Sequence, residues 1–178
     1  SDSFSHAGVT SRFERAGERF LVHTIDANGR PDTFPVRYTF GVEPLQQYLV
    51  PFPGGHLQAL SLAWDTERRE WFHLYPDRDV PAGDWLHWTR NGQNWNGMCA
   101  ECHSTRLKKD FDPQTGSYNT SWFEINVGCE ACHGPASQHV EWAKRPALAR
   151  ARIENYGLSV PTNNLSPQKQ LVICAPCH

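Results

Sequence analysis

The segment "NWNGMCAECHST", residues 94–105, contains two cysteines three positions apart and a histidine directly after the second. The same spacing returns in "GCEACHGP", residues 128–135, and in "ICAPCH", residues 173–178. The three copies use all 6 cysteines of the chain, namely Cys99, Cys102, Cys129, Cys132, Cys174 and Cys177. The histidines that complete them are His103, His133 and His178. A pattern that takes up every cysteine indicates one chemical role, repeated three times.

C-x-x-C-H is the attachment sequence for c-type haem, in which two thiols bond to the haem vinyl groups and the histidine binds iron. The spacing has a geometric reason. Positions three apart on a helical turn face the same side, so both sulfurs can reach one porphyrin edge while the next residue directs its imidazole to the metal. The sequence therefore predicts three covalently bound haem c groups, with the three motif histidines as iron ligands.

Cysteine pairs of this kind also occur in three other settings. Paired C-x-x-C segments can bind zinc, and the first two pairs are suitably separated for a four-cysteine site. A lone C-x-x-C can be a redox-active thiol pair. Six cysteines in an exported protein could form three disulfides. Because none of these alternatives needs a histidine after each pair, the pattern favours haem attachment.

Composition and charge are consistent with this interpretation. Apolar residues make up 39% of the 178 residues, slightly below the globular norm, and the chain has 7 tryptophans and 9 phenylalanines. We expect three haems to complete the core, with aromatic side chains packed around them. The formal charge of −2 gives no basic patch, so nucleic acid is not an expected partner. The haem propionates would make the holoprotein moderately acidic.

The first half of the chain has the pattern of antiparallel strands. Apolar residues alternate on either side of Asn28-Gly29, a hairpin signal. A second hairpin is expected around residues 53–55, and residues 69–76, "REWFHLYP", indicate another strand. We therefore expect a small antiparallel sheet between about residues 12 and 76.

The second half changes to tryptophan, asparagine, glycine and cysteine, with many helix and strand breakers. We expect a short helix at each C-x-x-C-H, a longer one over residues 136–143, another over residues 147–156, and loops elsewhere. The predicted fold class is α+β: a small antiparallel β-rich part over residues 1–84, followed by a short-helix and loop region with three haems over residues 85–178. The two parts could form one compact unit.

Each motif supplies one iron ligand, and the sixth position decides if a haem carries electrons or performs chemistry. His139 lies six residues after His133, and Gly134-Pro135 break the helix between them, so we expect His139 to cap a neighbouring haem. His87 lies between two tryptophans ahead of the first motif, and His73 has apolar neighbours. Both are further candidate ligands. The alternative for His139 is a solvent-facing histidine on a helix, and the alternative for His73 is a core histidine with its polar atoms satisfied. The remaining histidines, His6, His23 and His56, are weaker candidates.

Several separate segments occur in an order that resembles the haem-binding region of bacterial multihaem cytochromes c, a region often joined to tetratricopeptide repeats. They are "YTFGVEPLQQYLVPFPGGHLQALSLAWD", "WFHLYPD", "LHWT", "QNWNGMCAECHST" and "EINVGCEACHGPASQHVEWA". The resemblance covers residues 11–143, and beyond them it rests on the third motif. Such relatives usually have a further C-x-x-C-H upstream and more chain downstream, so we expect this chain to be a piece of a longer protein.

The resemblance implies a redox role outside the cytoplasm, because bacteria attach c-type haem beyond the cytoplasmic membrane. We expect an electron carrier of the periplasm or cell exterior that exchanges electrons with other redox proteins or with copies of itself. No stretch approaches the roughly 20 apolar residues of a membrane span. The alternatives are a multihaem oxidoreductase with one open-site haem, or the subunit of a self-assembling conductive filament. No lysine replaces a motif histidine and no acid–base cluster stands out, so an enzyme is the less favoured class.

Overall fold

The structure is a computed structural model that describes residues 2–160 and 164–177. It divides into two compact units. The first takes the chain up to Ala100 and then Lys108–Ser121, and the second consists of Glu101–Leu107 and the chain from Trp122 onward. The β-rich first half and the later short helices confirm the predicted α+β class. The expected domains, residues 1–84 and 85–178, stay a prediction.

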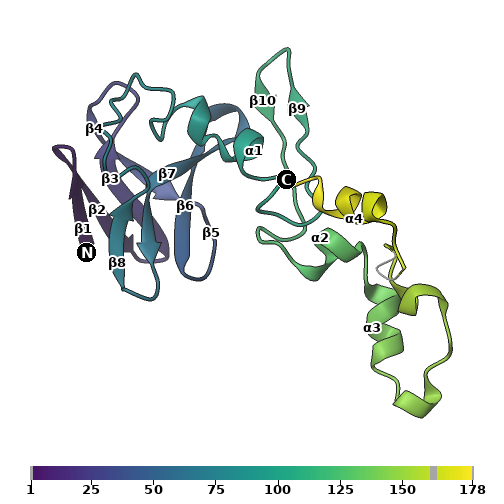
Figure 1. Ribbon diagram of the computed structural model, residues 1–178. Coiled ribbons are helices and arrows are strands. Elements are labelled where there is room, and N and C mark those ends of the chain that lie inside the picture. Colours follow the sequence, from purple (N-terminus) through teal and green to yellow (C-terminus); the bar gives the residue numbers. More distant parts are fainter. Residues whose placement is uncertain (1, 161–163, 178) are drawn as a thin grey trace. The chain divides into compact units, whose positions relative to one another are not determined.

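The first unit contains two four-stranded antiparallel sheets (Figure 1). The first sheet has the strands β1 (Asp2–His6), β2 (Val9–Ala16), β3 (Arg19–Ile25) and β4 (Pro31–Val36), in that order. The second has β5 (Tyr38–Phe40), β6 (Leu45–Phe52), β7 (His56–Asp65) and β8 (Glu70–His73). The expected hairpins are confirmed, because β3 and β4 pair across the Asn28-Gly29 turn and β6 pairs with β7. The strand β1 lies ahead of the segment where strands were expected.

The core of the first unit lies between the two sheets. Val22 on β3, Val50 on β6 and Leu60 on β7 pack with Trp88 and are at most 5% exposed. Partly buried aromatic rings surround this cluster, so alternating strand positions from both sheets fill one interior. The indole Nε1 of Trp88 donates to the carbonyl of Ile25 at 3.0 Å, which satisfies its polar atom.

The first unit also contains short elements, one between β6 and β7 and the others after β8. They are the 3₁₀ turns η1 (Pro53–Gly55) and η2 (Asn91–Gln93), the helix α1 (Trp95–Met98), and the strands β9 (Phe111–Asp112) and β10 (Ser117–Tyr118), which pair as a hairpin. Gly55 has a φ of +73°, and a side chain there would collide with the carbonyl oxygen of Tyr118. Only glycine allows this close approach between η1 and β10.

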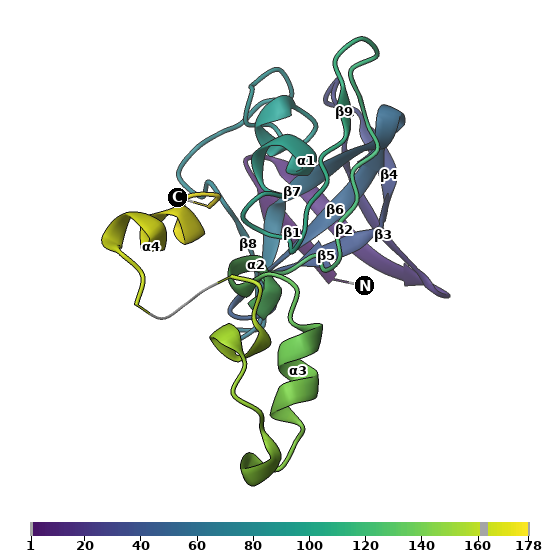
Figure 2. The same ribbon diagram turned by 90° about the vertical axis from the view of Figure 1, so that its right-hand side faces the viewer.

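The second unit consists of short helices and loops (Figure 2). Its helices are α2 (Cys129–His133), α3 (Ser137–Ala143) and α4 (Pro167–Cys174), with the 3₁₀ turns η3 (Ala147–Ala149) and η4 (Glu154–Gly157). The expected helix over residues 136–143 is confirmed as α3. The break at Gly134-Pro135 is confirmed too, because α2 ends at His133 and Gly134 follows with a φ of +68°.

The expected helix over residues 147–156 is wrong, because the chain forms η3 and η4 there instead. Two long side chains in and beside this segment donate hydrogen bonds to backbone carbonyls. Trp142 donates from Nε1 to the carbonyl of Ala151 at 2.8 Å, and Arg150 donates to the carbonyls of Ala143 and Arg145 at 2.8 and 2.9 Å. These contacts fold the segment back along α3 (Figure 2).

Candidate functional site

The start of the first motif is fixed by two buried asparagines. Asn94 is the N-cap of α1, and its Oδ1 accepts a hydrogen bond from the backbone N–H of Gly97 at 3.0 Å. Its Nδ2 donates to Oε1 of Gln58 at 3.0 Å. A short helix of this length is not stable alone, so the cap and the contact with β7 hold α1 directly ahead of Cys99.

Asn96 completes this anchor and is fully buried. Its Oδ1 accepts from the backbone N–H of Leu57 on β7 at 2.7 Å, and its Nδ2 donates to the hydroxyl of Thr120 at 2.9 Å. Both polar ends of the amide are therefore used inside the protein. Sequence reasoning missed this role, because the capping signal, an asparagine before a helix, belongs to Asn94 and not to Asn96.

Hydrogen bonds connect the chain just ahead of the second motif to Thr105, the last residue of the segment 94–105 that contains the first motif. Thr105 is 1% exposed and lies in the second unit. Its hydroxyl donates to the carbonyl of Asn126 and accepts from the backbone N–H of Gly128, both at 2.8 Å. The backbone N–H of Thr105 donates to the carbonyl of Glu124 at 2.8 Å. Because Gly128 is the N-cap of α2, this network fixes the chain directly ahead of the second motif.

The second motif forms α2 itself, as the helical spacing argument predicts. The short helix expected at the first motif is wrong, because α1 ends at Met98 and turns follow over Cys99–Cys102, and at the third motif α4 ends at its first cysteine, Cys174. Cys129 and Cys132 are exposed, while His133 is half-buried. The Nδ1 atom of His133 is buried and has no hydrogen-bond partner among the described residues. The two thiols at one helix face are thus open to a ligand, and the adjacent imidazole has an unsatisfied polar atom.

The third motif begins at the end of α4, where Cys174 is the last helical residue. The motif histidine His178 lies outside the described residues. Cys177 lies beside the first motif: the thiol of Cys102 donates to the carbonyl of Cys177 at 3.4 Å. Burial raises the pKa of the Cys177 thiol, and the neighbouring thiols of Cys102 and Cys132 raise it further. One cysteine from each motif therefore gathers in one region of the second unit.

The second unit has almost no apolar core made by protein alone. Among its described residues, those that are buried are Ser104 and Thr105, and none is hydrophobic. Eight large apolar side chains of this unit are exposed: Phe123, Val127, Val140, Leu148, Ile153, Tyr156, Leu171 and Val172. In a unit of this size, large apolar cofactors would cover the apolar side chains that are otherwise exposed to water. Haem groups attached to its cysteines fit this observation.

The arrangement of the cysteines bears on two alternatives to haem, disulfide bonds and a zinc site. No disulfide joins any of the six, all of which lie in the described part of the chain. Within residues 2–160 and 164–177, no group of three or more histidine, cysteine or acidic side chains is arranged to hold a metal ion directly. A structural zinc site would need four such ligands in tetrahedral contact.

His139 lies on α3 with one ring nitrogen already fixed. Its Nδ1 donates to the carbonyl of Tyr156 on η4 at 2.9 Å. The proton is then on Nδ1, so the lone pair of Nε2 is left for a metal, which is the arrangement usual for ligating histidines. The side chain is half-buried beside Trp142. The Tyr156 carbonyl was not foreseen from the sequence.

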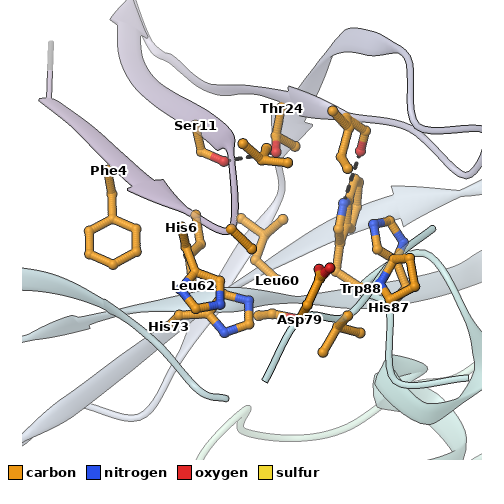
Figure 3. A pocket seen from close by; sticks show the side chains of 16 residues that line it. Phe4, His6, Ser11, Thr24, Leu60, Leu62, His73, Asp79, His87 and Trp88 are labelled. Atoms are coloured by element: carbon orange, nitrogen blue, oxygen red, sulfur yellow. Dashed lines mark hydrogen bonds between the residues drawn. The ribbon is translucent and has the colours of Figure 1, made fainter. Parts of the chain in front are cut away.

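His73 and His87 both line a small cavity of about 110 Å³ in the first unit (Figure 3). His73 stacks on His6 with ring centroids 4.0 Å apart, and the backbone N–H of Tyr75 donates to its Nδ1 at 3.0 Å. His87 is 4% exposed, and its Nδ1 lies 2.9 Å from the hydroxyl of Thr89. Burial lowers the pKa of both histidines, which keeps them neutral near pH 7.

Neutral imidazole is the form that binds a metal and also the form that suits a protein core. For His73 the bond from Tyr75 places the proton on Nε2, so ligation through that nitrogen would first require a change of tautomer. The assignments of His139, His87 and His73 as iron ligands stay predictions.

The weaker candidates have other partners. His56 donates from Nε2 to the carbonyl of Gly116 at 2.8 Å and accepts at Nδ1 from Asn94 at 3.2 Å, so it joins β7 to the β9–β10 hairpin. His23 lies in a network with Arg12 and Glu14 on the outer face of the first sheet. These contacts give both histidines a structural role.

A comparison with protein families finds a match for part of the chain. Residues 86–134 match the family model described as cytochrome c554 and c-prime. This match supports a cytochrome c family. It begins just before His87, covers the first two C-x-x-C-H motifs and ends at Gly134, so it spans less than half of the chain. Searches of curated proteins and of solved structures found no match.

A cytochrome c family implies covalently bound haem c and electron transfer as the general function. The matched residues include the anchor at Asn94 and Asn96, the Thr105–Gly128 contact and the helix α2. Among the described residues, no helix is long and apolar enough to cross a bilayer.

Proposed function

We propose that the chain is a three-haem c-type cytochrome that transfers electrons outside the cytoplasm. The observation that carries the proposal is the gathering of Cys102, Cys132 and Cys177, one from each motif, in a unit that lacks an apolar core of its own. Haems attached at these positions would lie close to one another. Closely spaced haems are suited to passing electrons from one partner to the next.

The residues have distinct tasks in this proposal. The six cysteines hold the three haems, and His103, His133 and His178 bind iron from one side. When bound, haem c supplies an iron centre that changes between two oxidation states. His139, His87 and His73 would bind iron from the other side and so close the sixth position, which favours electron transfer over chemistry on a substrate. The surrounding chain sets the spacing of the motifs and limits the access of water.

Partners and location are part of the same proposal. We expect exchange with other redox proteins or with copies of this chain, in the periplasm or at the cell exterior. The acidic holoprotein favours a partner with a basic contact surface. A filament built from copies would be an extension of the same electron path and is separated from a soluble carrier by electron microscopy of the purified protein.

Four measurements test the proposal. The mass of the denatured chain should exceed that of the polypeptide by three haem groups, and the alkaline pyridine spectrum should be of the c type. The ferric protein should show no high-spin band and should not bind cyanide rapidly. Fewer than three covalent haems would contradict the haem count, and one haem that binds small ligands would support the oxidoreductase alternative.

A further inference from the structure

The first unit contains a cavity that the haem-related residues do not use. It has a volume of about 570 Å³ and opens between the two four-stranded sheets. Its lining comes from both sheets, with residues on β1, β2, β3, β4, β5, β6 and β8. Cavities of several hundred Å³ at the mouth of a closed or nearly closed sheet structure are a common place for small-molecule binding.

Aromatic rings form much of the wall. Phe13 and Trp71 stack with centroids 3.6 Å apart and planes at 3°, and Tyr48 lies against Trp71 at 5.4 Å. Phe20 and Tyr38 also line the cavity. Flat apolar walls of this kind favour a planar ring system, which gains both stacking and removal of apolar surface from water.

One polar atom in this wall has no partner. The Nε1 atom of Trp71 is buried and makes no hydrogen bond to any described residue. A buried N–H without an acceptor is destabilising, because it has lost water without a replacement. Because this atom is itself buried, a molecule in the cavity would contact the ring of Trp71 and not this N–H.

Two guanidinium groups lie at the same cavity. Arg15 lies over the ring of Phe20 and Arg37 over the ring of Tyr38, each with its Cζ atom 5.6 Å from the ring centroid. Within the described part of the chain, neither forms an ion pair with a carboxylate. Arg15 donates from Nε to the carbonyl of Gly17 at 3.1 Å. Stacking on an aromatic ring leaves the terminal in-plane N–H donors of an arginine available to an anion.

The acidic residues of the lining do not cancel this charge. Glu14 already bonds to Arg12 at 2.8 Å and to His23 at 2.9 Å, and these contacts lower the pKa of its carboxyl group. Asp2 is the other carboxylate in the lining. The negative charge of Glu14 is thus balanced by groups outside the cavity. The two positive charges of Arg15 and Arg37 then exceed the single negative charge of Asp2, so the cavity is complementary to an anion.

We propose that this cavity binds a small planar aromatic molecule that carries an acidic group. The rings of Phe13, Trp71 and Tyr48 contact its ring system, and Arg15 and Arg37 bind its carboxylate or sulfonate. The inference is independent of the haem count, because every residue that carries it lies in the β-rich first unit.

The test uses the haem-containing full chain and two matched probes, anthraquinone-2-sulfonate and the neutral 2-(hydroxymethyl)anthraquinone. Isothermal titration calorimetry of the air-oxidised protein should give saturable binding of one sulfonate probe per chain. The variants Arg37→Gln and Arg15→Gln should each lower the affinity for the sulfonate probe by about tenfold. Their affinity for the neutral probe should change by less than about twofold, since the aromatic wall is intact.

Arg30→Gln is the matched control, because Arg30 is an exposed arginine of the same unit that does not line the cavity. It should leave the affinity for both probes unchanged, and circular dichroism should show the same fold for all three variants. Absence of saturable binding of the sulfonate probe would overturn the proposal. Equal weakening by Arg30→Gln and Arg37→Gln would overturn it as well, because it would indicate general charge attraction.

Discussion

The hydroxyl of Thr105 accepts a hydrogen bond from the backbone N–H of Gly128 and donates one to the carbonyl of Asn126, both at 2.8 Å. Thr105 ends the segment of the first C-x-x-C-H motif, and Gly128 precedes the second. A single buried side chain therefore links two C-x-x-C-H segments that lie more than twenty residues apart in the sequence. The link lies within the second unit, where few other buried contacts exist.

Thr105→Val tests this link, because valine has the same shape but no hydroxyl. The change removes both hydrogen bonds of the buried hydroxyl, the one from the Gly128 N–H and the one to the Asn126 carbonyl, so the free energy of unfolding should fall by about 1–3 kcal/mol. Urea denaturation followed by circular dichroism measures the loss. Thr115→Val is the control, since the exposed hydroxyl of Thr115 bonds to Asp112 and its loss should cost less. Equal stability of both variants would contradict the structural role of Thr105.

Asn96→Leu tests the anchor of α1 in the first unit. The leucine fills a similar volume but leaves the backbone N–H of Leu57 and the hydroxyl of Thr120 without their bonds to Asn96. The free energy of unfolding should fall by about 1–3 kcal/mol, measured by urea denaturation. The exposed Asn91, changed to leucine in the same way, should have little effect. A loss that is the same for both positions would show that the buried amide is not the cause.

Removal of haem should unfold one unit and spare the other. A variant with all six cysteines changed to alanine cannot attach haem covalently. The core around Val22, Val50 and Leu60 should keep slow amide hydrogen exchange in β3, β6 and β7. The helices α2 and α3 should lose protection, because no hydrophobic side chain is buried among the described residues of their unit. Equal protection of α2 and α3 in this variant and in the holoprotein would contradict the role of haem as the core.

Local signals in the sequence were sufficient for much of this architecture. Asn28-Gly29 and the proline and two glycines at 53–55 placed two hairpins correctly, since turn residues and strand alternation act over short distances. The spacing of Cys129 and Cys132 likewise predicted the helix α2. The β1–β2 hairpin was missed because its turn places Ala7, with a φ of +47°, at a position that usually requires glycine or asparagine.

Contacts between distant residues were not predictable in the same way. Three hydrogen bonds depend on the tertiary fold, which brings distant segments together: Thr105 to Gly128, Leu57 to Asn96, and His139 to Tyr156. The helix wrongly expected over residues 147–156 has the same cause. Its alanines favour a helix locally, but the bond from Trp142 to Ala151 is made in another backbone conformation.

The pH dependence of stability should include a contribution from Asp26 in the β3–β4 turn. The backbone N–H groups of Arg30 and Asn28 donate to its carboxylate, each at 2.8 Å, and lower its pKa. The unfolded chain therefore binds a proton more readily than the folded one. This contribution is present above the ordinary pKa of an aspartate, about 4, and is lost as the pH falls through the lower folded value.

Asp26→Asn isolates this effect, because the amide oxygen still accepts both hydrogen bonds but cannot ionise. Urea midpoints measured from about pH 6 down to about pH 3 should fall less steeply in the variant than in the unchanged protein. Asp77→Asn, at an exposed aspartate outside the turn, should keep the original slope. A variant slope at Asp26 that equals the original would show that the turn carboxylate does not contribute.

His139 is the candidate distal ligand whose geometry is most complete. Its Nδ1–H bonds to the carbonyl of Tyr156, which fixes the tautomer and leaves Nε2 with its lone pair. His139→Ala should therefore turn one ferric haem high-spin, visible by electron paramagnetic resonance, and should allow that haem to bind cyanide. Added imidazole should restore the low-spin signal, because it supplies the missing ligand. His56→Ala provides the contrast: it removes the bond to Gly116 and should lower stability by about 1 kcal/mol while all haems stay low-spin. If the His139 variant keeps every haem low-spin, its imidazole stabilises the turn at Tyr156 and another residue closes that iron.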